Sequence, residues 1–271
     1  PEGVLYTYFI NEVTNWEETG ETSPSGLPLV KAKAWSQRPV RLFLEGPVHY
    51  MKVFPERARE VYRSVRESNL FDDKLEMYKS CENMEGEDPE IGRAVGAYPR
   101  GWIENESIYL HMEYKYLLEI LRSGLCEEYY GDIASALVAF QKPESYGRNP
   151  LEGASFLVSS AFEDPTLHGR AYQPRLSGIT CEFVHMWTLM MAGPAPMRVT
   201  SEGDLYLQLS PRLSGAYFLK AHRVVKYLDP LDGLTQVRLR RGDFAFNLFG
   251  RCLVVYRNPE MKDTFGDSGV G

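Results

Sequence analysis

The sequence lacks any long apolar segment, and its cysteines are few and scattered. No run approaches the roughly 18 apolar residues that a membrane-spanning helix needs, and no signal-peptide core opens the chain. The cysteines form no Cys-x-x-Cys pair, which predicts reduced thiols in a cytoplasmic protein and no metal site. The four cysteines are Cys81, Cys126, Cys181 and Cys252.

Nucleotide-binding signatures are also missing. Neither the glycine-rich dinucleotide fingerprint nor the phosphate-binding P-loop pattern occurs, and strands do not alternate with helices, so nucleotide-binding folds are disfavoured. The formal net charge of -7 argues against a nucleic-acid partner, since a basic footprint is the usual sign of one.

The composition is that of a globular protein with a sizeable core. The 271 residues are 44% hydrophobic and 25% charged, which suits one large domain or two smaller ones. The chain opens at Pro1 without an initiator methionine, and its first residues are already apolar. We therefore expect it to be a piece of a longer protein.

The periodicity of apolar residues predicts three regions. Residues 1–40 read as an extended segment, residues 41–195 as helical hairpins, and residues 196–271 as a β domain with a tail. Helices are predicted at Glu56–Ser68, Ile108–Arg122, Glu127–Phe140 and Ser177–Met191. Helical hairpins followed by short strands predict a mainly α fold, all or part of an α/α barrel, with a β appendage.

The stretch His168–Thr180 is the first candidate site. Ser177 can cap the helix that follows, and a helix start offers free N–H groups and the positive end of a dipole. Arg170 and Arg175 strengthen the interpretation as an anion site. An ordinary capped helix whose arginines face solvent explains the same pattern.

Two further clusters carry polar side chains. Trp102, Glu104, Glu106 and His111 gather at the entry of the long central helix. There the histidine can equally be structural, and the glutamates can simply complement the helix dipole. The second cluster is the loop Tyr146–Glu152, with Arg148 and Glu152, which can also be a surface loop with a solvated ion pair.

These residue types permit one particular chemistry. Glycoside hydrolysis normally needs two carboxylates, whereas phosphate as nucleophile attacks the anomeric carbon itself and needs no general base. One acid and an anion cradle then suffice. His111, the Ser177 hydroxyl and the Gly178 N–H can form such a cradle, with Arg170 nearby. The residues alone do not select phosphate over other anions.

Four segments are considered together: Arg100–His111, Tyr146–Arg148, His168–Arg170 and Leu176–Gly178. They resemble the C-terminal half of the glycoside phosphorylases of glycoside hydrolase family 94. The nearest likeness is to members acting on β-1,2-linked glucooligosaccharides, and cellobiose phosphorylase is more distant. The resemblance implies part of an (α/α)6 barrel followed by a C-terminal antiparallel β domain. It implies inverting phosphorolysis of a β-linked glucooligosaccharide to α-glucose 1-phosphate.

The resemblance also assigns roles. It implies that His111, Ser177 and Gly178 bind phosphate and that Glu152 contacts the sugar. The family's general acid is an upstream aspartate without a counterpart here, so the catalytic residue is unknown. Inorganic phosphate is the co-substrate, with no cofactor and no metal. The missing N-terminal half is an expected partner, and a homodimer is possible. We further expect substrate contacts from Arg170, Trp102, Glu104 and Glu106.

Two other functions remain open at this point. The same barrel can be an inverting hydrolase in which Glu104, Glu106 or Glu152 acts on water. The chain can also be a non-catalytic, sugar-binding or truncated barrel subunit.

Overall fold

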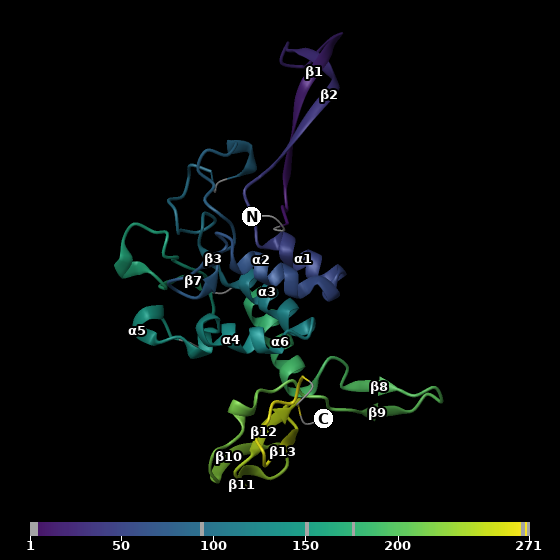
Figure 1. The fold of residues 1–271 in the computed structure, drawn as a ribbon, viewed down its shortest axis with the longest axis vertical. Helices are drawn as coiled ribbons and strands as arrows, with labels where there is room; N and C mark the ends of the chain where they lie inside the picture. Colours follow the sequence, from purple (N-terminus) through teal and green to yellow (C-terminus); the bar gives the residue numbers. More distant parts are fainter. Residues whose placement is uncertain (1–4, 93–94, 150–151, 175–176, 267–268, 270–271) are drawn as a thin grey trace. The chain divides into compact units, whose positions relative to one another are not determined.

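The computed structural model of the protein describes residues 5–92, 95–149, 152–174, 177–266 and 269. The chain divides into two compact units (Figure 1). The first consists of residues 1–123 and 132–180, and the second of residues 124–131 and 181–271. Two helices, α4 (Cys126–Ala136) and α6 (Ser177–Ala192), contribute residues to both units.

The first unit combines short helices with small antiparallel sheets. Its other helices are α1 (Glu45–Val53), α2 (Ala58–Arg66), α3 (Leu110–Arg122) and α5 (Pro143–Tyr146). Its strands are β1 (Phe9–Thr22), β2 (Pro28–Pro39), β3 (Phe71–Asp72), β4 (Met77–Tyr78), β5 (Ile108–Tyr109), β6 (Ala154–Leu157) and β7 (Ala171–Pro174).

A long antiparallel hairpin, β1 and β2, occupies most of the segment that was expected to be merely extended (Figure 1). Its turn closes with hydrogen bonds between Ser23 and Leu27, and Gly26 supplies the positive φ of 80° that such a turn requires. Trp16 and Trp35 are 58% and 60% exposed. The hairpin therefore adds little to the core.

The core of the first unit forms around α3. The apolar face of this helix, including Leu117, Ile120 and Leu121, has no exposed surface and packs toward α1 and β6. The helix ends before Gly124, whose φ of 83° suits a helix C-terminus. The predicted helix Ile108–Arg122 is confirmed except at its start, because Ile108 and Tyr109 form β5 instead.

A buried polar network joins α2 to the C-terminal part of α4. The carboxylate of Asp132 accepts hydrogen bonds from the Arg66 guanidinium at 2.5 Å, from the Tyr78 hydroxyl at 2.6 Å and from the Tyr62 hydroxyl at 3.3 Å. Asp132 is only 4% exposed and Tyr78 is fully buried. Both therefore depend on each other for hydrogen bonding.

Replacing Asp132 with alanine is expected to lower the free energy of unfolding by about 1.5–3 kcal/mol, because Tyr78 loses its acceptor and Arg66 its partner. Denaturant unfolding measures this. Asp73→Ala, at an exposed position of the same unit, should change stability by less than about 0.5 kcal/mol. Equal stability of the two variants would contradict the assigned network.

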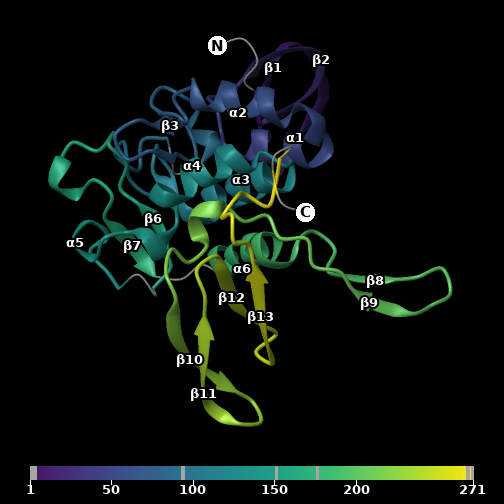
Figure 2. The same cartoon turned by 60° about the horizontal axis from the view of Figure 1, so that its bottom comes forward.

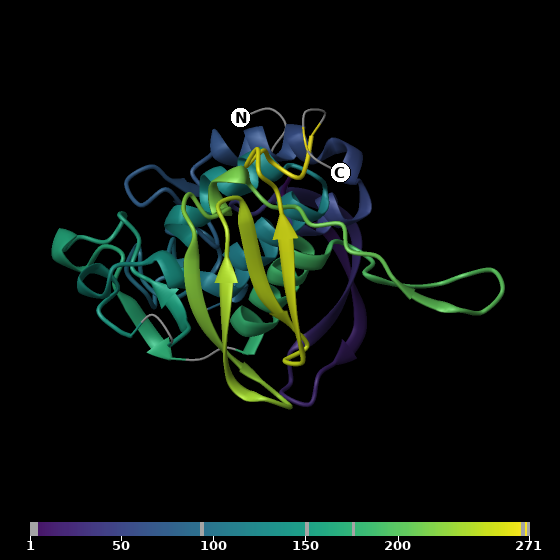
Figure 3. The same ribbon diagram turned by 90° about the horizontal axis from the view of Figure 1, so that it is seen from below.

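The second unit pairs one helix with three hairpins. The residues of α6 that belong to it pack on β12, where Trp187 meets Phe246 edge to face at 5.5 Å. The Tyr256 hydroxyl also donates to the Met191 carbonyl at 2.6 Å. The hairpins of residues 223–239 and 243–257 lie side by side in Figures 2 and 3. The three are β8–β9 (Met197–Val199, Leu205–Leu207), β10–β11 (Arg223–Asp229, Gly233–Leu239) and β12–β13 (Asp243–Leu248, Cys252–Arg257).

The predicted fold class is wrong. The described residues form six α-helices and are 30% helical and 30% strand, with many small antiparallel sheets, which is not a mainly α (α/α)6 barrel. Helical periodicity correctly located most helices, but the strands β3 to β7 form within residues 41–195, where helical hairpins were expected. The prediction failed because local periodicity does not specify how helices close into a ring.

Candidate functional site

A three-stranded sheet in the first unit brings the predicted phosphate-binding residues together. Its strand order is β5-β6-β7, and both pairs are antiparallel. The first and third strands therefore run in the same direction and end at the same edge. Beyond that edge β5 leads to His111, and β7 leads to the start of α6.

His111 and Gly178 are in close contact. A Cβ atom added to Gly178 would stand 2.5 Å from both Cδ2 and Cε1 of the His111 ring, far inside van der Waals distance. Only glycine allows the imidazole to lie this close to the first turn of α6. Both residues are partly exposed.

The start of α6 is suited to an anion. The helix has 16 residues and no acidic residue in its first turn, so the positive end of its dipole is not neutralised from within. Ser177 begins the helix, but its side chain lies outside the described residues, as does Arg175. The predicted hydroxyl contact and the contribution of Arg175 therefore stay predictions.

The loop after α5 lies next to this helix start. Gly153 faces the side chain of Ile179, to which an added Cβ would come within 3.5 Å. The preceding residue, Glu152, is exposed and forms an ion pair with Arg148 at 3.3 Å. The structure thus brings the second predicted cluster next to the first.

Arg170 reaches the same loop from the start of β7. Its guanidinium lies over Gly147, within 3.2 Å of where a Cβ would stand. Arg148 donates to the Ala171 carbonyl at 3.1 Å. Arg148, Arg170 and Tyr172 help to line a cavity of about 390 Å³. Two arginines at one small cavity suit a ligand that carries oxygen acceptors.

Trp102 belongs to an aromatic cluster on the sheet. Its ring lies 4.7 Å from that of Tyr172, 5.3 Å from Phe156 and 5.5 Å from Phe162, measured between ring centroids. It is half-buried, so part of the indole remains available to a sugar. A role in substrate binding stays a prediction.

The carboxylate of Glu106 forms ion pairs with two cations. It is 3% exposed, and its carboxylate pairs with Lys79 at 3.1 Å and with Arg100 at 2.6 Å. Burial tends to raise its pKa, but Arg100 and Lys79 together keep the pKa of Glu106 below its ordinary value. The carboxylate therefore stays ionised, which makes it unsuited to donate a proton.

The backbone at Glu106 is also unusual. Its φ is 57°, a left-handed conformation that non-glycine residues rarely adopt, and such strain often accompanies functional sites. Together with Arg100, Lys74 and Ser160, it lines a charged cavity of about 660 Å³. Glu104 is exposed, and its carbonyl accepts a hydrogen bond from the Cys81 thiol at 3.1 Å.

Tyr146 was placed in the second predicted cluster, but its role there was not predicted. Tyr146 is fully buried, and its hydroxyl donates to the Glu152 carbonyl at 2.6 Å and accepts from the Ala154 N–H at 3.0 Å. It therefore fixes the loop on which Glu152 stands. The adjacent run Ala154–Leu157 is buried throughout and apolar except for Ser155, and it was the available signal for the central strand.

Membrane helices and metal centres are both absent from the described residues. None of the helices described is long and apolar enough to cross a membrane. No group of three or more His, Cys, Asp or Glu side chains within the described ranges is placed to hold a metal ion.

No protein-family model matches this chain, and no curated protein matches it.

Proposed function

We propose that this chain forms the phosphate-binding side of an enzyme that cleaves a β-linked glucooligosaccharide by inverting phosphorolysis. Phosphate would bind at the start of α6, between the free N–H groups of its first turn and the His111 imidazole. The sugar would lie toward Glu152, Arg170 and Trp102. The product would be α-glucose 1-phosphate, and the proposed location is the cytoplasm, supported by four cysteines without a disulfide.

The contact between His111 and Gly178 is the observation that carries this proposal. It places an imidazole ring beside the positive end of a long helix that has no first-turn acid. Helix N-termini bind phosphate through backbone N–H groups and the helix dipole. A charge-assisted donor such as a protonated imidazole strengthens such a site.

The environments of the glutamates favour phosphorolysis over hydrolysis. A hydrolase needs a carboxylic acid that donates a proton and a carboxylate that activates water. Glu106 is tied to Lys79 and Arg100, and Glu152 is paired with Arg148. Against the effect of burial, Arg100 and Lys79 keep the pKa of Glu106 below its ordinary value, so this group is ill suited to donate a proton. Phosphorolysis needs no general base, so the arrangement suits it better.

Replacing His111 with alanine is expected to weaken the binding of inorganic phosphate roughly ten- to hundredfold. Loss of one charge-assisted hydrogen bond costs about 1.5–3 kcal/mol. Calorimetric titration of phosphate into the 271-residue chain measures the effect. His49→Ala is the matched control, because the His49 side chain is 60% exposed and lies on α1, away from the sheet edge.

Equal phosphate affinity in the wild type and in His111→Ala would contradict the assigned site. The predicted activity has its own test, which is release of α-glucose 1-phosphate from a β-1,2-linked glucooligosaccharide only when phosphate is present. Release of glucose without phosphate would instead support a hydrolase.

A further inference from the structure

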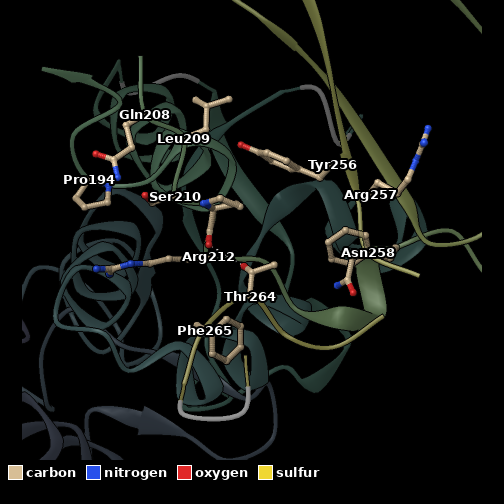
Figure 4. Close-up of a pocket in the computed structure, with 12 residues that line it drawn as sticks. Pro194, Gln208, Leu209, Ser210, Arg212, Tyr256, Arg257, Asn258, Thr264 and Phe265 are labelled. Atoms are coloured by element: carbon tan, nitrogen blue, oxygen red, sulfur yellow. Dashed lines mark hydrogen bonds between the residues drawn. The ribbon is translucent and has the colours of Figure 1, made fainter. Parts of the chain in front are cut away.

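The second unit contains a groove that takes no part in the phosphate site. Its volume is about 640 Å³, within the range of about 300–1,000 Å³ typical of small-molecule sites. The walls come from the loop after α6, the segment after β9, the end of β13 and the C-terminal segment (Figure 4). The side chains used below are those of Gln208, Ser210, Tyr256, Arg257, Asn258, Thr264 and Phe265.

Two aromatic rings of the groove are held in place. The Tyr256 ring is fixed through the hydrogen bond from its hydroxyl to the Met191 carbonyl. Phe265 stacks on Tyr130, with the ring centroids 5.7 Å apart and the planes 10° apart. Both rings are only partly buried, so they offer rigid apolar surface at low entropic cost.

The polar groups of the groove are amides and hydroxyls with unused hydrogen-bonding capacity. Asn258 is 7% exposed, and its Nδ2 donates to the Lys262 carbonyl at 2.7 Å. No hydrogen bond to its Oδ1 is found within the described ranges, so this oxygen can still accept one at the wall. The exposed side chains of Gln208 and Ser210 likewise make no hydrogen bond within the described part of the chain.

Two arginines, Arg212 and Arg257, line the groove, so its charge suits a ligand rich in oxygen acceptors. No lining residue is acidic, which disfavours a cation. The Arg257 guanidinium is already paired with the buried carboxylate of Asp243 at 3.4 Å, which offsets its charge. The Thr264 hydroxyl donates to the Pro211 carbonyl at 2.7 Å, which joins two walls. Flat apolar faces beside amide and hydroxyl groups match a sugar ring, with its C–H faces and its hydroxyl edge.

We propose that this groove is a second carbohydrate site that binds a short β-glucan segment. The choice of a glucan among neutral sugars rests on the function proposed for the first unit. The aromatic faces of Tyr256 and Phe265 would pack on sugar rings. Gln208, Ser210 and the Oδ1 atom of Asn258 would hydrogen-bond their hydroxyl groups.

The test is a titration of β-1,2-linked glucotetraose into the 271-residue chain, followed by NMR. The side-chain amide signals of Gln208 and Asn258 are local probes, and both should shift on binding. Phe265→Ala should weaken this binding at least tenfold, and Gln208→Ala at least threefold. Phe249→Ala is the matched control, because Phe249 belongs to the same unit but is 69% exposed outside the groove.

The variants also separate the two proposals. Phe265 contacts Tyr130 and can matter for folding, whereas Gln208 is exposed, so Gln208→Ala keeps the test decisive. His111→Ala should lose phosphate affinity and keep the shifts at Gln208 and Asn258. Absent shifts, or unchanged glucan affinity in both groove variants, would overturn the second site even if phosphate binds as proposed. If the groove variants weaken glucan binding but the wild type binds no phosphate, only the proposed function is refuted.

Discussion

Replacing Gly178 with alanine is expected to weaken phosphate binding roughly ten- to hundredfold while leaving the protein folded. The new methyl group would collide with the His111 ring, and a side chain yields more easily than backbone. The imidazole would then move away from the start of α6. The variant loses one charge-assisted contact, about 1.5–3 kcal/mol. Calorimetry measures the affinity for phosphate, and thermal unfolding measures whether the variant stays folded.

Gly131→Ala is the matched control for this substitution. Gly131 lies inside α4, and a Cβ added there meets nothing within 4 Å. Alanine at this position should stabilise the helix by about 0.5–1 kcal/mol without changing phosphate affinity. If Gly178→Ala also bound phosphate like the wild type, the close contact with His111 would have no functional meaning.

The second large effect is expected at Glu113, a carboxyl group buried on α3. The residue has no exposed surface, its Oε1 accepts the Tyr78 N–H at 2.9 Å, and its Oε2 has no partner among the described residues. Burial above all, with the nearby Asp132 and Asp72 carboxylates, raises the pKa of Glu113 well above its ordinary value, against the opposing Tyr78 N–H. The folded protein therefore keeps this group protonated.

The sign of the pH effect follows from this shift. Because the folded state holds the proton more tightly, the stabilisation is fully present below the unfolded pKa near 4.5. This stabilisation is lost as the pH rises toward the folded pKa. The free energy of unfolding then falls by up to about 1.4 kcal/mol per pH unit. Glu113→Gln, which cannot ionise, should remove this slope. Denaturant unfolding of both proteins from pH 5 to pH 8 measures the difference.

Glu56→Gln, at an exposed position of the same unit, should leave the pH dependence of unfolding unchanged. Parallel stability curves for the wild type and Glu113→Gln would mean that Glu113 ionises in the folded state as freely as in the unfolded chain. That outcome would contradict its assigned burial.

The sequence predicted the helices that carry the site better than the sheet that arranges them. Apolar residues of α3 recur at helical spacing, and a glycine follows the end of both α3 and α6. Both helices were therefore predicted close to their bounds. The strand Ala154–Leu157 is short and buried on all sides, so it lacks the alternation that identifies a half-buried strand. His111 and Gly178 were named together as a possible anion cradle, but the local pattern did not predict the strand that brings them into contact.

The environment of Glu106 could not be predicted from local sequence either. Its position before α3 indicated a carboxylate that complements a helix dipole. In the structure it adopts a positive φ and pairs with Lys79 and Arg100. Lys79 is distant in sequence, and no glycine marks the left-handed backbone. Only tertiary contacts show that this carboxylate is ion-paired and lines a cavity.

The most direct test of the phosphate site is NMR of the backbone amides during a titration with inorganic phosphate. If phosphate binds at the start of α6, the Gly178 and Ile179 amide signals should shift most. They should saturate together with the ring signals of His111. In His111→Ala the Gly178 and Ile179 shifts should need roughly ten- to hundredfold more phosphate, and in His49→Ala they should be unchanged. Phosphate-induced shifts confined to other residues, or none at saturating phosphate, would contradict the account.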